Sequence, residues 1–422
     1  MSLKTSPVPP LAPTGQPSAQ TTDQTIGQST GQPIGLSAGM TFMMAAACGL
    51  IAANLYYSQP LAGPIAAAIG LPVEATGLIV TLTQIGYGIG LLLLVPLGDL
   101  VENRRLIVGM IGLVTLALIA AGFSTTPGPF LAASLAIGLG SVAVQMIVPF
   151  AANLAPDAVR GRVVGNVMSG LMLGIMMARP VASVIAHLFS WHTMFYLSAV
   201  VMVALAGLLW TRLPRRAPAA KLSYLQLIGS MGRLLASQPV LQRRAAYQAF
   251  QFAAFSLFWT VTPLYLAGPA FGLSQGGIAL FALAGVAGAI ASPIAGRLAD
   301  RGLVRPATAF GLASVAVAFL LTHIAAEGSS LALALLTFAA ILLDFGVTMT
   351  LVTGQRSIYE LGADLRSRLN GLFMAIFFSG GAIGSALGAW AFAAGAWSLA
   401  SLIGLALPVL ALAVFVTEKR KA

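Results

Sequence analysis

Two ionisable side chains, Asp344 and Arg179, lie deep inside long apolar segments and are the residues best placed to do chemistry. Asp344 stands near the middle of the apolar run 331–353, in the stretch Leu-Leu-Asp-Phe-Gly. Burial favours the protonated form of a carboxyl group, whereas a neighbouring arginine favours its ionised form. Asp344 is therefore a candidate for binding a proton or a substrate, and a structural salt bridge is the alternative.

Arg179 directly precedes Pro180 inside the apolar run 164–187. A proline inside a helix removes one backbone hydrogen bond and frees a carbonyl one turn earlier, so this helix should be interrupted here. The guanidinium of Arg179 could bind an anionic group of a substrate or pair with Asp344.

Polar and aromatic side chains recur at helical spacing in several other apolar runs and are candidates for lining a cavity. They are Asn54, Tyr57, Gln84, Tyr87, Gln145, Gln248, Gln251, Phe255, Trp259 and Thr348. Aromatic surfaces with few polar groups suit amphipathic organic molecules, and the lack of an acidic or basic cluster argues against a highly charged ligand. For any single aromatic residue, packing is the alternative role.

Enzyme and metal chemistry find little support in the sequence. The three histidines are far apart, and the single cysteine, Cys48, which we interpret as a packing residue, gives no metal-ligand spacing. No nucleophile and base stand in a recognisable arrangement. We therefore expect neither an enzyme nor a cofactor or metal site.

The segments that carry these side chains are long enough to cross a lipid bilayer. Hydrophobic residues make up 58% of the chain and charged residues only 8%, which is too little polar cover for a soluble domain. A helix needs about 20 apolar residues to cross the hydrocarbon core. Twelve such runs lie near 40–61, 75–98, 105–123, 129–151, 164–187, 192–211, 245–267, 275–296, 306–323, 331–353, 369–391 and 397–416.

The basic residues predict the orientation of these helices. Of the 22 Lys and Arg residues, all except Arg179 fall in gaps or tails on one side of the predicted membrane. Because basic connections stay in the cytoplasm, both termini are expected there. The net charge of +11 is thus explained by topology, and we expect no nucleic-acid partner.

The chain divides into two halves with matching segments. We predict a disordered cytoplasmic tail at 1–38, a six-helix bundle at 39–212, a cytoplasmic linker at 213–244, a second six-helix bundle at 245–417 and a basic tail at 418–422. The second and eighth predicted helices are each followed by a glycine with an acid four residues later. These segments contain Gly98, Asp99, Glu102, Arg104 and Arg105 in the first half, and Gly296, Asp300 and Arg301 in the second.

With these repeated segments, residues 38–417 resemble the major facilitator superfamily, in its twelve-helix bacterial drug and metabolite efflux branch. The family signature Gly-x-Leu-Ala-Asp-Arg-x-Gly-Arg-Arg is matched in shortened form from Gly98 and more closely from Gly296 to Arg301. The run Asn-Leu-Tyr-Tyr-Ser-Gln-Pro-Leu at 54–61 resembles one found in that efflux branch. Near Arg179 the branch's glycine and proline motif is matched only in part, and Gln145 and Asn153 lie in the fourth helix, which lacks the arginine of many members.

The resemblance implies an all-α membrane protein with twelve transmembrane helices in two six-helix bundles, located in the bacterial inner membrane. Loop carboxylates such as Glu102 and Asp300 could contact the opposite half only when the cytoplasmic side closes, so they would stabilise the outward-open state. Ordinary solvated loop charges are the alternative.

We therefore expect a transporter that exports a small organic molecule, such as a drug, sugar or nucleoside-like metabolite, by proton antiport. The expected energy source is the proton gradient, the expected partners are the substrate and the lipid bilayer, and we expect a monomer. Proton-coupled uptake, uncoupled facilitated diffusion and a non-transporting membrane sensor are the alternatives.

Overall fold

The computed structural model describes residues 37–156, 159–215, 223–362 and 365–418, apart from the side chains of 287–289. In this part of the chain all regular elements are helices, as the sequence predicts. The predicted tail at 1–38 and the end of the basic tail therefore lie almost entirely outside the described residues.

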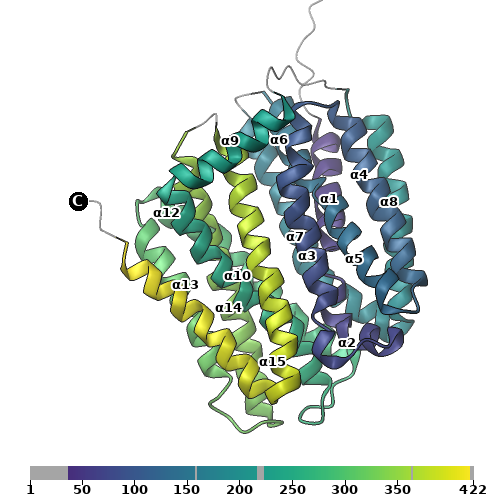
Figure 1. Cartoon of the computed structure of the whole chain (residues 1–422), viewed down its shortest axis with the longest axis vertical. Helices are drawn as coiled ribbons and strands as arrows, with labels where there is room; N and C mark the ends of the chain where they lie inside the picture. The colour runs from purple at the N-terminus through teal and green to yellow at the C-terminus, as the bar shows by residue number, and fades with distance from the viewer. Residues whose placement is uncertain (1–36, 157–158, 216–222, 363–364, 419–422) are drawn as a thin grey trace, which may run out of the picture. The chain divides into compact units, whose positions relative to one another are not determined.

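The first half contains α1 (Ala38–Ala53), α2 (Ser58–Ile69), the 3-10 helix η1 (Val73–Ala75), α3 (Leu78–Leu93), the 3-10 helix η2 (Val95–Asp99), α4 (Asn103–Phe123), α5 (Pro127–Ser141), α6 (Val144–Leu154), α7 (Arg160–Leu188) and α8 (Trp191–Arg212). The second half contains α9 (Tyr224–Ser237), α10 (Pro239–Ala267), α11 (Gln275–Ala282), the 3-10 helix η3 (Leu283–Ile290), α12 (Ala291–Asp300), α13 (Val304–Leu321), α14 (Ser330–Tyr359) and α15 (Arg366–Val416). Figure 1 shows these helices running side by side.

Eleven helical segments among the described residues are long and apolar enough to cross a membrane. The last of them, α15, has 51 residues and contains non-helical backbone angles at Gly395 and Ala396. The chain reverses at this point, so α15 supplies two crossings and corresponds to the last two predicted runs. The twelve-helix prediction is confirmed in this sense.

Two boundaries differ from the sequence prediction. The first span extends from Ala38 to Ile69, whereas its predicted run ends at residue 61. Pro60 lies in the first turn of α2, where a proline does not interrupt the hydrogen bonds, so the span continues beyond it. The predicted linker at 213–244 contains the amphipathic helix α9 and the beginning of α10. A capping box formed by Ser223 and Gln226 starts α9.

Each half is held together by close helix pairs. In the first half α1 packs on α7, α3 on α5 and α4 on α8, and in the second half α10 packs on α15 and α13 on α14. The two halves meet through α2 with α10, α3 with α15, and α7 with α11. Small residues let such helices approach closely in lipid, where van der Waals packing drives their association.

We call the end of the helices that carries residues 93–105, 212–215, 297–305 and 356–362 the basic end, and the end that carries residues 70–77, 188–191, 267–275 and 321–330 the opposite end. Helix α9 joins the two halves at the basic end. The hydroxyl of Tyr224 donates to the carbonyl of Leu93 over 2.8 Å, and Arg368 donates to the hydroxyl of Ser230 over 3.0 Å.

Candidate functional site

Arg179 of α7 is buried among aromatic rings, with 3% of its surface exposed. Its Nε donates to Oε1 of Gln59 in α2 over 2.8 Å. The guanidinium carbon lies 4.3 Å from the ring centre of Trp259, 4.9 Å from that of Phe255 and 5.2 Å from that of Tyr56. Each contact of a desolvated cation with an aromatic face contributes up to about 2 kcal/mol. These rings therefore replace part of the water that the cation has lost.

Asp344 of α14 is also buried and contacts the same tryptophan. Its Oδ1 accepts a hydrogen bond from Nε1 of Trp259 over 2.8 Å. A Cβ atom at Gly285 of η3 would lie 2.7 Å from Oδ2 of Asp344 and 2.9 Å from the Trp259 ring, so only glycine leaves room for this pair. None of the ion pairs of 4.0 Å or less among the described residues joins Arg179 to Asp344.

Trp259 connects the two charges and, with them, the two halves of the protein. Its ring face contacts Arg179 from the first half, while its indole N–H donates to Asp344 from the second half. We call Arg179, Trp259 and Asp344 the central triad. Because the cation–π contact crosses between the halves and the hydrogen bond does not, relative motion of the halves would break only the former.

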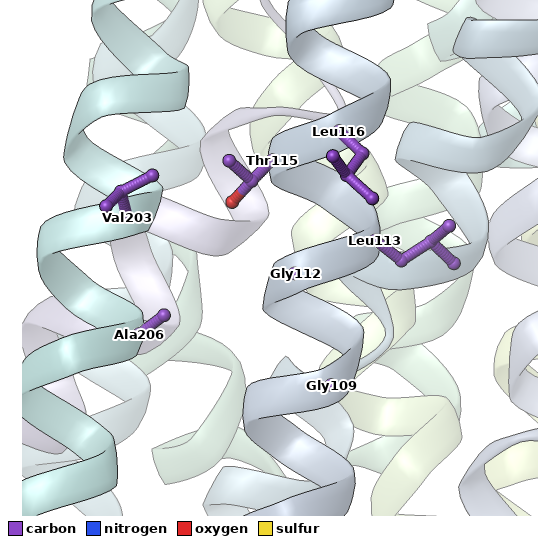
Figure 2. A pocket seen from close by; sticks show the side chains of 7 residues that line it. All are labelled: Gly109, Gly112, Leu113, Thr115, Leu116, Val203 and Ala206. Carbon is purple, nitrogen blue, oxygen red and sulfur yellow. The ribbon is translucent and has the colours of Figure 1, made fainter.

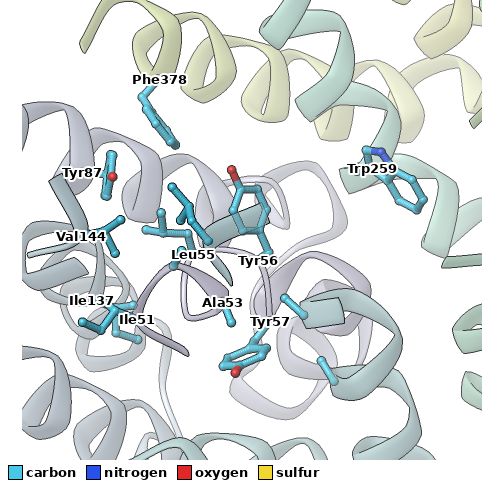
Figure 3. Close-up of a cluster of buried hydrophobic side chains, with 14 of the residues drawn as sticks. Ile51, Ala53, Leu55, Tyr56, Tyr57, Tyr87, Ile137, Val144, Trp259 and Phe378 are labelled. Atoms are coloured by element: carbon cyan, nitrogen blue, oxygen red, sulfur yellow. The ribbon is translucent and has the colours of Figure 1, made fainter. Parts of the chain in front are cut away.

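Irregular backbone positions the residues around the central triad. Between α1 and α2 the amides of Asn54, Leu55 and Tyr56 donate to carbonyls three residues earlier, which winds the chain more tightly than an α-helix. This turn carries Tyr56 and precedes Gln59. Figure 3 shows Tyr56 between the Tyr87 and Phe378 rings on one side and Trp259 on the other. Within a membrane protein, non-helical backbone occurs where it is buried in protein or lines a water-filled cavity.

A second polar contact between the halves lies in α3 and α10. Nε2 of Gln84 donates to the hydroxyl of Ser256 over 2.7 Å. Tyr87, one turn along α3, accepts a hydrogen bond from Gln145 over 3.0 Å, and its ring lies 4.3 Å from the ring of Phe378 in α15. Gln84 and Tyr87 therefore lie where the halves meet, and Gln145 contacts Tyr87 from within the first half.

Other cavity candidates contact residues of their own half. Asn54 accepts from Ser198 over 2.6 Å and donates to backbone carbonyls of its own helix. Gln248 and Gln251 donate to the carbonyls of Val347 and Gly311, which belong to the second half. Tyr57 is buried in the first half, and Thr348, half-buried, follows Asp344 by one turn of α14.

Glu102 and Arg104, two of the predicted gating charges, make contacts within the first half in this structure. The carboxylate of Glu102 caps α4 by accepting from the amides of Arg104 and Arg105 over 3.0 and 3.3 Å. The Arg104 guanidinium donates to the carbonyls of Trp210 and Leu213, at the end of α8.

The second copy behaves in the same way. Asp300 pairs with Arg356 of α14 over 3.9 Å, and both are exposed, as is Arg301. Gly98 lies near the end of η2, and Gly296 lies in the middle of α12. Asp99 is also exposed and, unlike Glu102 and Asp300, interacts electrostatically with a residue of the other half, Arg368.

The two halves approach most closely at the opposite end. A Cβ atom at Gly77 would collide with the carbonyl oxygen of Ser385, and the hydroxyls of Thr81 and Ser385 lie 2.7 Å apart. Towards the basic end the same pair of helices packs less tightly, because a Cβ at Gly88 would lie at an ordinary contact distance, 3.8 Å, from the carbonyl oxygen of Ala375. Helix α7 likewise meets the second half over α11 and η3, near the opposite end.

A pocket of about 550 Å³ lies away from the central triad, between α4 and α8 (Figure 2). It is lined by apolar and small residues and contains none of the candidates predicted from the sequence. Its lining residues are Gly109, Gly112, Leu113, Thr115, Leu116, Val203 and Ala206.

Sequence reasoning did not list Gln59, Ser256 or Phe378 among the site residues. Gln59 had a usable signal, since it is a polar residue beside a proline within an apolar run. Ser256 and Phe378 had none, because a serine or phenylalanine in a membrane helix usually serves packing.

The chain matches a model of the Major Facilitator Superfamily over residues 36–355 and 248–422. It is 40% identical over 347 residues to the uncharacterized transporter YgaY of Escherichia coli O157:H7, which covers 82% of this chain and 87% of that protein. It is 31% identical over 361 residues to SCO4007 of Streptomyces coelicolor, described as a probable transporter, with coverage of 83% and 80%.

Two solved structures share the fold. A mutant of the nucleoside transporter NupG has a TM-score of 0.74 at 15% identity and covers 90% of this chain and 100% of its own. A bacterial homologue of the human lysosomal transporter Spinster, in an inward-facing and unoccupied conformation, has a TM-score of 0.67 at 13% identity, with coverage of 89% and 95%. At such identities the similarity shows the architecture alone.

Proposed function

Because the chain belongs to the Major Facilitator Superfamily and is a multi-pass membrane transporter, we propose that it exports a small organic molecule in exchange for protons. The observation that carries the proposal is the central triad, where a buried carboxyl and a buried arginine from different halves share one tryptophan. A carboxyl that is reached from each side in turn is the minimum device for coupling substrate movement to a proton gradient.

The positive-inside rule supports an orientation with the basic end in the cytoplasm. In that orientation the more tightly packed opposite end faces outward, which supports an inward-facing state for this structure. The carboxylates of Glu102 and Asp300 fit this assignment, because the contacts that they make among the described residues lie within their own halves. In the outward-open state these carboxylates would meet the other half.

Export is supported by the resemblance of residues 54–61 to the bacterial efflux branch. In the structure this segment forms the turn between α1 and α2 and the first turn of α2, and it supplies Tyr56 and Gln59 to the site. The segment that resembles the efflux branch is thus also the segment that contacts Arg179.

Proteoliposomes with an imposed pH gradient test the proposal. Protein inserted in a known orientation is exposed to pools of antibiotics, sugars, nucleosides and organic acids, and the internal pH is followed with pyranine. Antiport predicts that one pool moves protons opposite to the substrate. Proton movement in the same direction as the substrate would assign uptake instead, and substrate movement without protons would assign a facilitator.

A further inference from the structure

The guanidinium of Arg179 has donors that the described part of the protein leaves unused. Its Nη2 is buried and has no hydrogen-bond partner among the described residues. The same is true of Nε2 of Gln59, the residue that already accepts from Arg179. Buried donors are nearly always paired, so two adjacent unpaired donors indicate a missing acceptor.

The carboxylate of Asp344 does not fill this role. It accepts a hydrogen bond from Trp259, and among the described residues it forms no ion pair of 4.0 Å or less with Arg179. The aromatic rings cannot fill it either, because they offer faces to the cation rather than lone pairs to its N–H edge. A guanidinium edge beside an amide N–H matches the two oxygens of a carboxylate or sulfonate.

The charge balance of the site allows one additional negative charge. The charged and titratable groups that interact with Asp344 are Arg179 from α7 and Tyr56 from the turn after α1, while α10 contributes the neutral Trp259. When Asp344 is protonated, Arg179 is left as an uncompensated buried cation, which is costly. A bound monoanion restores neutrality in that state. Binding of the anion and the proton together would move both in the same direction, so the exchange proposed above requires the anion to bind also when Asp344 is ionised.

The side chains around Arg179 indicate what the uncharged part of the ligand should be. Phe255, Trp259 and Tyr56 surround the cation, and Phe252 stacks on Phe377 with ring centres 3.6 Å apart close to Phe255. Such surfaces favour an apolar or aromatic body. A cationic ligand would be repelled by the charge of Arg179.

We propose that Arg179 and Gln59 bind the carboxylate or sulfonate group of a small organic monoanion with an apolar body, and that this molecule is the transported substrate. The inference rests on the proposed function, since it names the substrate class of the same site.

The test uses the full-length protein in nanodiscs and three probes of similar shape: benzoate, neutral benzamide and cationic benzylamine. Hexanoate and benzenesulfonate extend the set of anions. Binding is measured from the shift in thermal unfolding temperature at pH 6 and pH 8. We expect at least one anion to stabilise the protein at both pH values, with no stabilisation by benzamide or benzylamine. Stabilisation at pH 6 alone would support binding of a monoanion but would contradict the proposed exchange, because it assigns movement of anion and proton in the same direction.

Variants assign the effect to the site. Arg179→Gln should weaken anion binding roughly 10- to 100-fold, because it removes a charge-assisted bidentate contact. Arg179→Lys, which keeps the charge but lacks the fork, should weaken it less, and Gln59→Leu should also weaken it. The exposed Arg212→Gln is the matched control and should bind as the native protein does.

Three results would overturn the inference: no stabilisation by any of the anions, equal stabilisation by benzamide or benzylamine, or an anion effect that survives both Arg179→Gln and Gln59→Leu. Should the proteoliposome pools reveal proton-coupled transport of a neutral or cationic compound, the proposed function would stand and the monoanion inference alone would fall.

Discussion

Replacing Trp259 with leucine should shift the protein away from the state described here. The Trp259 ring contacts the Arg179 guanidinium at 4.3 Å across the two halves, whereas its bond to Asp344 lies within the second half. Only the contact between Arg179 and Trp259 therefore changes when the two halves move relative to each other. A desolvated cation–π contact contributes about 2 kcal/mol, which corresponds to a roughly 30-fold change in the equilibrium between the states.

The assay is pulsed electron spin resonance between two pairs of labels. One pair, at Leu188 and Ile324, reports on the opposite end, and the other, at Val101 and Leu303, reports on the basic end; all four positions are exposed. Cys48 is buried, and a Cys48→Ala background removes it as a labelling site. Trp259→Leu should lengthen the Leu188–Ile324 distance and shorten the Val101–Leu303 distance.

Trp259→Phe is the matched control, because phenylalanine keeps a ring face for Arg179 but loses the N–H donor to Asp344. It should shift the distances much less than leucine. If both variants shift the populations equally, the contact between the halves does not act through the ring face. If neither shifts them, the central triad does not contribute to the balance between states, and this part of the reasoning is refuted.

Three further substitutions have outcomes that follow from particular contacts. Gly77→Val should separate α3 from α15 at the opposite end, because even a Cβ atom there meets the Ser385 carbonyl, and the Leu188–Ile324 label distance should lengthen. Glu102→Gln should lower the outward-open fraction, seen as greater reactivity of a cysteine at Val101; unchanged reactivity would indicate an ordinary loop charge. Arg244→Gln should lower the thermal unfolding temperature, because Arg244 is buried and pairs with Glu418 over 3.2 Å; an unchanged temperature would show that this pair contributes little.

The fold could be predicted from the sequence because the bilayer imposes the length and composition of each segment. The break at Gly395 and Ala396 falls in the predicted gap between the last two runs. The first span differs from its predicted run, because Pro60 lies in the first turn of α2 and the helix continues beyond residue 61. The amphipathic helix α9 was missed because its apolar residues are too few for a membrane span.

The sequence identified the two charged residues of the candidate site but not the contacts that connect them. Asp344 and Arg179 stand out because charge is expensive in lipid, and the structure brings both to Trp259. Their indirect connection through an indole depends on the relative position of helices far apart in the chain, which hydropathy does not encode. Asn54 and Gln251 show the opposite case, since a polar residue in a membrane helix can equally satisfy the backbone of a neighbour.

The measurement that tests the central claim most directly is transport by Asp344→Asn in proteoliposomes, using the substrate that the pools identify. The control is Glu74→Gln, which removes a carboxylate in η1 near the opposite end. The account predicts that Asp344→Asn abolishes accumulation driven by a pH gradient but retains substrate exchange without a gradient, while Glu74→Gln keeps both. Unchanged gradient-driven accumulation by Asp344→Asn would contradict the assignment of Asp344 as the proton carrier.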